Sequence, residues 1–325
     1  MRGVRIVGLV VVVAVLVLGA AQAGASPRGT NGQITYDRID PSTGTQSAFT
    51  ANPDGSSEHL LVFNTSAGGW SPDGSKLAVA YQLDDGRIGT ATVNADGTGY
   101  TPFPIDDPLG TLNAPCGIWS PDGKQLACET WDNTAPDRGG IYTISSADGS
   151  SLTRVTNPNG GDDQPGAYSP NGKQLVFARF DPGQFFAEGL FVVNTDGTHL
   201  RQITPPGTII QQGNDGDWSP QGNEIIFSRH LTPDVRGSIW VIHADGTGLH
   251  EIHVQGLACG GGPDGLGCHG VHWSPDGKKI IFDVNSPATP AGNIYTANAD
   301  GTGLHQVTFD GGDDDPAWGT HPLTP

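Results

Sequence analysis

Acidic side chains that could bind a metal ion recur at one place in the chain, shortly before the aromatic residue of a repeated motif. The carboxylates in these positions are Asp162, Asp163, Asp215, Asp217, Asp313, Asp314 and Asp315. Carboxylate oxygens are the ligands that Ca²⁺ prefers, so calcium is the candidate ion. The candidate metal ligands are Asp215, Asp217, Asp314 and Asp315. None of these segments has the spacing of a calcium-binding loop, which leaves an acidic, hydrated rim without an ion as the alternative.

Three histidines add nitrogen donors that could serve a transition metal. His230 follows one predicted strand, and His269 and His272 lie in the long connection before the next repeat. A zinc or manganese site needs at least three ligands in a fixed geometry. Histidines that are hydrated at the surface, without a metal, are the alternative.

Motifs of the common hydrolases and of nucleotide-dependent enzymes are absent. The sequence has no Gly-x-Ser-x-Gly elbow, no phosphate-binding glycine loop and no His-Glu-x-x-His motif. This favours noncatalytic binding over catalysis. A metal-dependent hydrolase or lyase of the lactonase or uronide-lyase kind, with its ligands gathered at one site, is the alternative from a different functional class.

A repeated motif predicts the fold that positions these side chains. An aromatic residue, Ser-Pro, a polar residue and Gly form the five segments Trp70–Gly74, Trp119–Gly123, Tyr168–Gly172, Trp218–Gly222 and Trp273–Gly277. Each segment precedes a β-rich run, a further strand, an Asp-Gly turn and a last strand. Four short strands, A to D, therefore repeat about every 50 residues, which is the period of an antiparallel propeller blade.

A sixth blade is divided between the two ends of the sequence. Residues 33–63 supply strands B, C and D without a strand A, and Asp315–Trp318 supplies a strand A with no strand after it. Pairing the two segments completes the blade and removes exposed sheet edges. The sequence thus predicts an all-β, six-bladed β-propeller closed by its N- and C-terminal strands, with residues 26–325 as one domain and the last few residues as a tail.

The pattern Trp-Ser-Pro-Asp-Gly, combined with Asn-Ala-Asp-Gly-Thr-Gly, resembles the β-propeller of TolB, the periplasmic partner of a peptidoglycan-associated lipoprotein. The resemblance covers about residues 30–320 and is specific for the fold, whereas many secreted proteins share such blades. TolB proteins also carry an α/β domain before the propeller. We expect no such domain here, so the resemblance does not imply what that domain recruits.

One rim of the predicted ring varies from blade to blade. The A–B and C–D turns are nearly identical among blades, whereas the B–C and D–A loops differ in length and chemistry. We call the rim that bears the B–C and D–A loops the variable face, and we expect binding there because variable loops on a rigid scaffold usually carry function. The candidate contact residues are Trp131, Asp163, Asp217, His230, His272, Asp283 and Asp315.

Four cysteines are expected to form two disulfides. Cys116 and Cys128 flank the A–B hairpin of one blade symmetrically, and Cys259 and Cys268 bracket a Gly-rich loop. Four cysteines allow three connectivities, and an oxidising compartment favours disulfides over free thiols. A four-cysteine metal site fits neither their spacing nor their placement in different blades.

The N-terminus predicts export. Arg2 and Arg5 precede an apolar run and then small residues, so residues 1–25 are typical of a signal peptide cleaved near residue 23 or 25. The chain carries 34 acidic and 16 basic residues, a net charge of −18. Such a charge disfavours nucleic acid as a partner. We expect a secreted or periplasmic monomer, without a membrane span once mature, that binds an extracytoplasmic protein or cell-envelope component.

Overall fold

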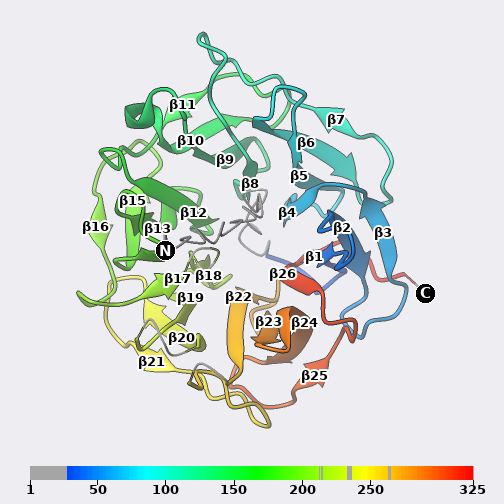
Figure 1. The fold of residues 1–325 in the computed structure, drawn as a ribbon. Coiled ribbons are helices and arrows are strands. Elements are labelled where there is room, and N and C mark those ends of the chain that lie inside the picture. The colour runs from blue at the N-terminus through cyan, green and yellow to red at the C-terminus, as the bar shows by residue number, and fades with distance from the viewer. Residues whose placement is uncertain (1–27, 212, 214, 233–235, 263–264, 325) are drawn as a thin grey trace, which may run out of the picture.

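The computed structural model describes residues 28–211, 213, 215–232, 236–262 and 265–324, and these residues form a ring of six antiparallel sheets (Figure 1). Each sheet has four strands, so the predicted six-bladed propeller is confirmed. No α-helix occurs in these ranges; a single 3₁₀ turn, η1, spans Pro136–Arg138. Within the same ranges, no helix is long and apolar enough to cross a membrane.

The blades follow one another around the ring in sequence order. The first blade contains β4 (Ser66–Trp70), β5 (Lys76–Gln82), β6 (Ile88–Asn94) and β7 (Thr101–Pro102). The second contains β8 (Cys116–Trp119), β9 (Gln125–Thr130), β10 (Gly140–Ser145) and β11 (Thr153–Arg154). The third contains β12 (Asp162–Tyr168), β13 (Gln174–Phe180), β15 (Leu190–Asn194) and β16 (Arg201–Gln202).

The remaining three blades have the same strand order. The fourth contains β18 (Asp217–Trp218), β19 (Glu224–Arg229), β20 (Ser238–His243) and β21 (His250–Glu251). The fifth contains β22 (Gly267–Trp273), β23 (Lys279–Ser286), β24 (Thr289–Asn298) and β25 (His305–Gln306). The closing blade contains β26 (Asp313–Trp318), β1 (Ile34–Ile39), β2 (Gln46–Ala51) and β3 (His59–Val62). An additional two-stranded sheet, which the repeat did not predict, joins β14 (Phe186–Ala187) to β17 (Ile210–Gln211).

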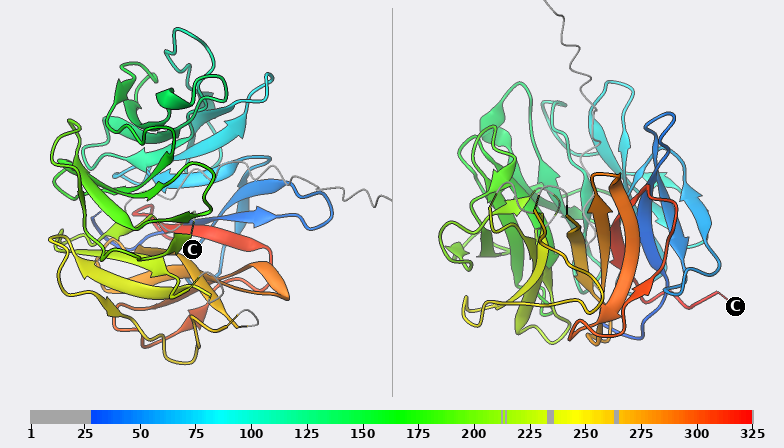
Figure 2. Two further views of the ribbon diagram at one scale, coloured as in Figure 1. Left: turned by 60° about the vertical axis from the view of Figure 1, so that its left-hand side comes forward. Right: turned by 60° about the horizontal axis from the view of Figure 1, so that its bottom comes forward.

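The first strand of every blade lies nearest the centre of the ring, as Figure 1 shows for β4, β8, β12, β18, β22 and β26. The fourth strands lie at the outside. Side views show the blades standing next to one another with loops at both ends of the ring (Figure 2). Each first strand begins at the variable face, so the side chains at its start lie near the centre of the ring on that face.

The predicted ring closure is confirmed by strand pairing. β26 pairs antiparallel with β1, with Ile34 opposite Trp318 and Asp37 opposite Asp314. The indole Nε1 of Trp318 donates to the carbonyl oxygen of Gly32 at 3.0 Å. These contacts cover the edge of β1, which would otherwise offer unpaired backbone groups to other chains.

The repeated Ser-Pro-Asp-Gly turn explains why each blade begins alike. In the first blade, Ser71 Oγ donates to Asp73 Oδ1 (2.7 Å) and accepts from the backbone N–H of Lys76 (2.9 Å). Gly74 has a φ of 69° and donates its N–H to the carbonyl oxygen of Ser71. A residue with a side chain rarely adopts this left-handed φ, so glycine closes the turn with little strain.

Buried apolar residues of neighbouring blades form the core. Phe177, Phe227 and Phe282 occupy the same place in successive second strands and are all fully buried. The indole of Trp119 also crosses between blades, donating to the carbonyl oxygen of Gly69 at 2.9 Å. Each sheet buries both of its faces against its neighbours, so the blades depend on one another for stability.

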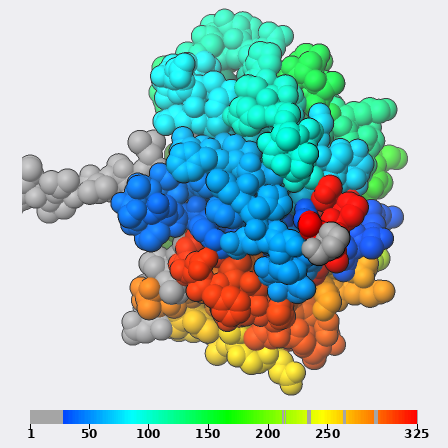
Figure 3. All heavy atoms as spheres, turned by 90° about the vertical axis from the view of Figure 1, so that its right-hand side faces the viewer, coloured from blue at the N-terminus to red at the C-terminus, as the bar shows by residue number. Residues whose placement is uncertain are grey.

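The C-terminal residues pack along the closing and first blades, where Figure 3 shows the last part of the chain in red against the blue N-terminal strands. The imidazole of His321 stacks on Trp70 with ring centroids 5.8 Å apart. Its carbonyl oxygen accepts from the N–H of Gln33 at 2.8 Å. Asn52 and Thr324 exchange two hydrogen bonds of 2.7 and 3.0 Å. This segment joins two blades.

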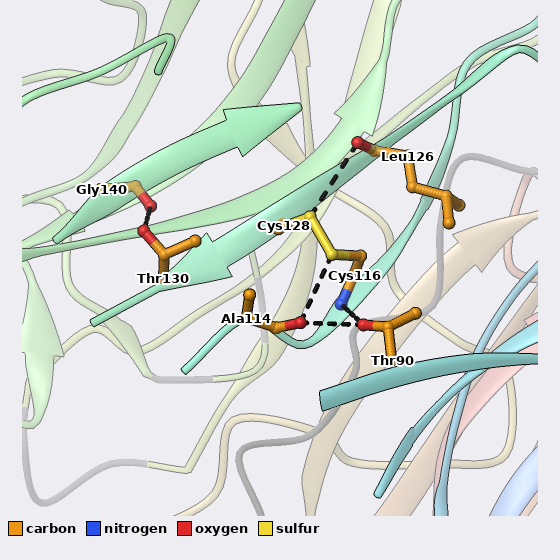
Figure 4. Close-up of a disulfide and its surroundings, with 7 residues drawn as sticks. All are labelled: Thr90, Ala114, Cys116, Leu126, Cys128, Thr130 and Gly140. Carbon is orange, nitrogen blue, oxygen red and sulfur yellow. Dashed lines mark hydrogen bonds between the residues drawn. A yellow bond between two sulfur atoms is a disulfide. The ribbon is translucent and has the colours of Figure 1, made fainter. Parts of the chain in front are cut away.

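Both predicted disulfides are present, Cys116–Cys128 and Cys259–Cys268. Cys116 lies opposite Cys128 across β8 and β9, as the symmetric spacing predicts (Figure 4). Each disulfide closes a short loop, so the chain-entropy model gives at most about 3 kcal/mol of stabilisation for either.

Candidate functional site

Three carboxylates of the closing blade converge at the variable-face end of its inner strands. Asp37, Asp314 and Asp315 each place an oxygen within 4.8 Å of the others. Asp37 is fully buried and accepts hydrogen bonds from Gln46 Nε2 (2.5 Å), Ser66 Oγ (2.8 Å) and the N–H of Ala67 (2.7 Å). We call Asp37, Asp314 and Asp315 the acidic cluster.

Burial and mutual repulsion affect the titration of the acidic cluster. Burial raises the pKa of Asp37 well above its usual value, and the charge of Asp315 raises it further. The pKa of Asp314 is raised by the same two causes, in the same order. Burial raises the pKa of Asp315 to about 6, against the opposing influence of His272. Desolvation disfavours the ionised form of each carboxyl, and a bound cation would stabilise it.

The fifth blade adds a fourth carboxyl beside the cluster. Asp283 is 3% exposed, and burial followed by the charge of Asp315 raises its pKa well above normal. Gly270, with a φ of 52°, lies between them: a Cβ there would lie 2.8 Å from Asp283 Oδ1 and 3.6 Å from the Cα of Asp315. A side chain at this glycine would therefore clash with the Asp283 carboxyl.

Asp217 and His272 connect the fourth and fifth blades. Asp217 Oδ2 accepts from the N–H of Trp273 at 2.8 Å and lies 3.5 Å from His272 Nδ1. Asp217 is completely buried, whereas His272 is partly exposed. The structure thus brings together two residues that the sequence selected from separate repeats.

A second acidic group lies on the second and third blades. Gln164 Nε2 donates to Glu129 Oε1 and Asp162 Oδ2, each at 3.2 Å. Burial, then the charge of Asp162, raises the pKa of Glu129 well above its ordinary value. Asp215, one of the predicted metal ligands, contributes to this repulsion rather than joining the acidic cluster.

Two of the acidic candidates already have a cationic partner. Asp163 is fully buried and accepts two hydrogen bonds from Arg179, of 2.6 and 2.8 Å. Asp313 accepts from Arg38 Nε at 2.6 Å. Their charges are therefore compensated within the blade, unlike those of the acidic cluster.

The histidines divide between two places. The His230 ring lies tilted against those of His269 and of Phe186 in the additional sheet, with ring centroids 5.5 Å apart in both cases. Burial lowers the pKa of His269 to about 3, so this imidazole is neutral at physiological pH. His272 faces Asp217 instead. The described residues contain one group of three potential metal ligands, and no histidine belongs to it.

Trp131 lies in the B–C loop of the second blade, where its backbone bridges to Asn113. Its partly buried side chain packs against Ala80 and Ile88 of the first blade. The rest of the indole is exposed to solvent, so this residue could contact a partner as well as pack against the first blade.

Comparison with known proteins places this ring among solved propellers. The structure of TolB from Acinetobacter baumannii matches with a TM-score of 0.66 and 19% identity over 88% of this chain and 66% of that one. A putative TolB from Agrobacterium tumefaciens matches with a TM-score of 0.59 and 18% identity over 86% and 90%. The fold is a TolB-like propeller.

The same TolB-like architecture occurs in enzymes. An oligogalacturonate lyase in complex with manganese matches with a TM-score of 0.56 and 14% identity, over 89% of this chain and 80% of the lyase. No protein-family model matches the sequence, and no curated protein matches it. At these identities the similarity establishes the fold, while function depends on the residues of the site.

Exposed apolar side chains also occur on the variable face of this TolB-like propeller. Several large hydrophobic residues in B–C or D–A loops are about half exposed or more: Phe63, Leu109, Phe185, Leu231 and Phe309. Single exposed apolar residues are common on any protein. Their occurrence in the loops of several blades, around an acidic centre, distinguishes this face.

Sequence reasoning missed Asp37 and Glu129, although the repeat contains a signal for them. Both residues, and Asp283, follow the third apolar position of a second strand, where other blades have Ala or Ser. Aligning the second strands as well as the turns would have identified an acidic position. The pairing of Asp163 with Arg179 has a similar signal, because Arg38 occupies the same place as Arg179.

Proposed function

We propose that this protein is a noncatalytic binding module that acts outside the cytoplasm. Its variable face binds a basic region of another protein or of a cell-envelope component. The observation that carries the proposal is the acidic cluster with Asp283 beside it, which lacks a compensating Lys or Arg among the described residues. A cationic side chain from a partner would supply the missing charge.

The exposed apolar residues of the same face support a protein partner. Protein interfaces combine apolar and aromatic contacts with polar groups at their rim. The candidate contact residues remain Trp131, Asp163, Asp217, His230, His272, Asp283 and Asp315. Within this set, Asp315 and Asp283 are proposed to bind charge, Trp131 offers apolar surface, and Asp163 positions Arg179.

The test is affinity capture from an extract of the producing cell's envelope. The variant Asp283→Asn/Asp315→Asn keeps side-chain size and removes both ionisable carboxyls from the variable face. A matched control, Asp73→Asn/Asp122→Asn, removes two charges from the opposite face. Asn171 already occupies that turn position in the third blade and accepts the same hydrogen bonds, so the control should fold normally.

We expect the first variant to lose the partner and the control to retain it. Equal retention by both variants would show that the variable face does not bind. Equal loss by both would attribute capture to overall charge rather than to this site.

A metal-dependent hydrolase or lyase is the second candidate function, favoured by the spacing of Asp37, Asp314 and Asp315. Three carboxylates suit calcium better than a transition metal, which prefers nitrogen or sulfur donors. Metal analysis of the purified protein separates the two functions. A stoichiometric transition metal together with turnover of lactones or uronides would establish the enzyme; calcium or no metal supports the binding module.

Export is part of the proposal. Residues 1–25 lie outside the described residues, and their assignment as a signal peptide rests on the sequence. Two disulfides fit an oxidising compartment. N-terminal sequencing of the protein from its native host should begin after residue 23 or 25; retention of Met1 would contradict export by cleavage.

A further inference from the structure

Arginine, an aromatic ring and an aspartate form the same unit in two blades. In the closing blade, Arg38 Nε donates to Asp313 Oδ1 at 2.6 Å, and its guanidinium carbon lies 4.7 Å from the ring centroid of Phe49. In the third blade, Arg179 Nε donates to Asp163 Oδ1 at 2.6 Å. Its guanidinium lies 5.4 Å from the centroid of Phe191, the counterpart of Phe49.

The fourth blade has the arginine and the ring but lacks the aspartate. Arg229 ends β19 at the place of Arg38 and Arg179, and its guanidinium carbon lies 4.8 Å from the ring centroid of Trp240. In sequence, the place of the aspartate is occupied by Gly213. The Nε of Arg229 is buried and has no hydrogen-bond partner among the described residues.

A buried guanidinium N–H without an acceptor is unfavourable, because it loses its hydration and gains nothing in exchange. The Trp240 ring stabilises the cation but supplies no acceptor for Nε. A carboxylate would supply one, with the bidentate geometry that Arg179 has with Asp163. The closing and third blades accommodate this pair. In the fourth blade the chain beside Arg229 takes another path, with Ile209 bridging to His230, so the aspartate's partner strand is missing there.

We propose that Arg229, on the Trp240 ring, binds a carboxylate of the polypeptide that docks on the variable face. The carboxylate takes the place that Asp163 and Asp313 fill in their own blades. This inference rests on the proposed function, because it takes the ligand to be a mainly basic polypeptide. A polyanionic saccharide is disfavoured, since its other carboxylates would face Asp283 and the acidic cluster.

The test uses two synthetic peptides that differ in one residue. One carries a single glutamate flanked by lysines, and the other carries glutamine in its place. We expect wild type to bind the glutamate peptide about tenfold more tightly, as one charge-assisted bidentate pair would give. Arg229→Gln should bind both peptides equally. In protein labelled with ¹⁵N at arginine Nε, the Arg229 signal should shift with the glutamate peptide only, while those of Arg38 and Arg179 stay in place.

Each contrary outcome has a distinct meaning. Equal binding of the two peptides to wild type, still weakened by Asp283→Asn/Asp315→Asn, would overturn the role of Arg229 and leave the proposed function standing. Failure of both peptides to bind would overturn both. If trigalacturonate binds in an Arg229-dependent way and more tightly than the glutamate peptide, the polypeptide assignment is wrong. Arg229→Gln should unfold at the wild-type denaturant concentration or above it, since it removes a buried group without a partner.

Discussion

At the scale of single residues, the buried ionisable groups differ in whether each has an oppositely charged partner. Asp163 with Arg179 and Asp313 with Arg38 are compensated pairs, whereas the Nε of Arg229 has no hydrogen-bond acceptor among the described residues. Removing one member of a buried pair leaves an uncompensated charge, which costs far more than the pair itself contributes. Chemically similar substitutions should therefore differ strongly in effect.

Arg179→Gln should reduce the free energy of unfolding by about 3 kcal/mol, because it leaves the fully buried Asp163 carboxylate without a cation. Arg229→Gln is the matched control and should change it by less than about 0.5 kcal/mol. Denaturant titrations of both variants and of wild type measure the difference. Equal destabilisation by the two substitutions would mean that Arg229 has a stabilising role the structure does not show.

Glu129→Gln should flatten the dependence of stability on pH. The pKa of Glu129 is raised in the folded protein, first by burial and then by the charge of Asp162. Its contribution to stability is therefore full below the unfolded pKa, about 4.3, and is lost as pH rises through the folded pKa. The variant has no charge to bury, so it should become the more stable protein at alkaline pH.

Unfolding at a series of pH values from about 4 to 8 tests this expectation. Buried carboxyls elsewhere in the ring contribute the same trend to both proteins, so the difference between the two curves reports Glu129 together with its neighbour Asp162. Glu188→Gln, at an exposed position, should follow the wild-type curve. Parallel curves for wild type and Glu129→Gln would refute the assignment of a raised pKa.

At the scale of elements, the last strand and the residues after it hold the ring closed. β26 completes the closing blade, and the following segment reaches the first blade through the stacking of His321 on Trp70. A hydrogen bond from Gln33 and the exchange between Asn52 and Thr324 add to this connection. Closure thus depends on contacts that span most of the sequence.

His321→Ala should lower the free energy of unfolding by about 1–2 kcal/mol, since it removes the ring stacking and a hydrogen bond between His321 and the carbonyl of Gly74. Ending the chain after Trp318 should cost about 3 kcal/mol or more, because the backbone bonds are lost as well. Leu323→Ala, at a half-exposed position, is the control and should have little effect. A truncated protein with wild-type stability would show that β26 alone closes the ring.

At the scale of the whole molecule, the chain has a net charge of −18 and therefore produces a negative electrostatic field. Such a field attracts a basic partner from a distance and is screened by salt. The association rate with the captured partner should fall about tenfold as ionic strength rises from about 50 to 500 mM, with a smaller change in the dissociation rate. Surface-binding kinetics at several salt concentrations measure both rates, and an association rate independent of salt would argue for an apolar interface instead.

The sequence by itself determined the blades, the ring closure and both disulfides. These features depend on local turn chemistry and on a repeat of about 50 residues. Ring closure could be predicted because each end of the chain holds an incomplete blade. Strands B to D lie in residues 33–63 and strand A lies in Asp315–Trp318.

Only the tertiary structure decided which carboxyls carry uncompensated charge. Asp37 accepts hydrogen bonds from Ser66 and Ala67 of the first blade, and Asp163 forms an ion pair with Arg179. Asp215 lies with Glu129 rather than with Asp315. Burial and charge pairing depend on distances across blades, which a one-dimensional pattern does not specify. The acidic cluster follows from how the ring brings distant strands together around its centre.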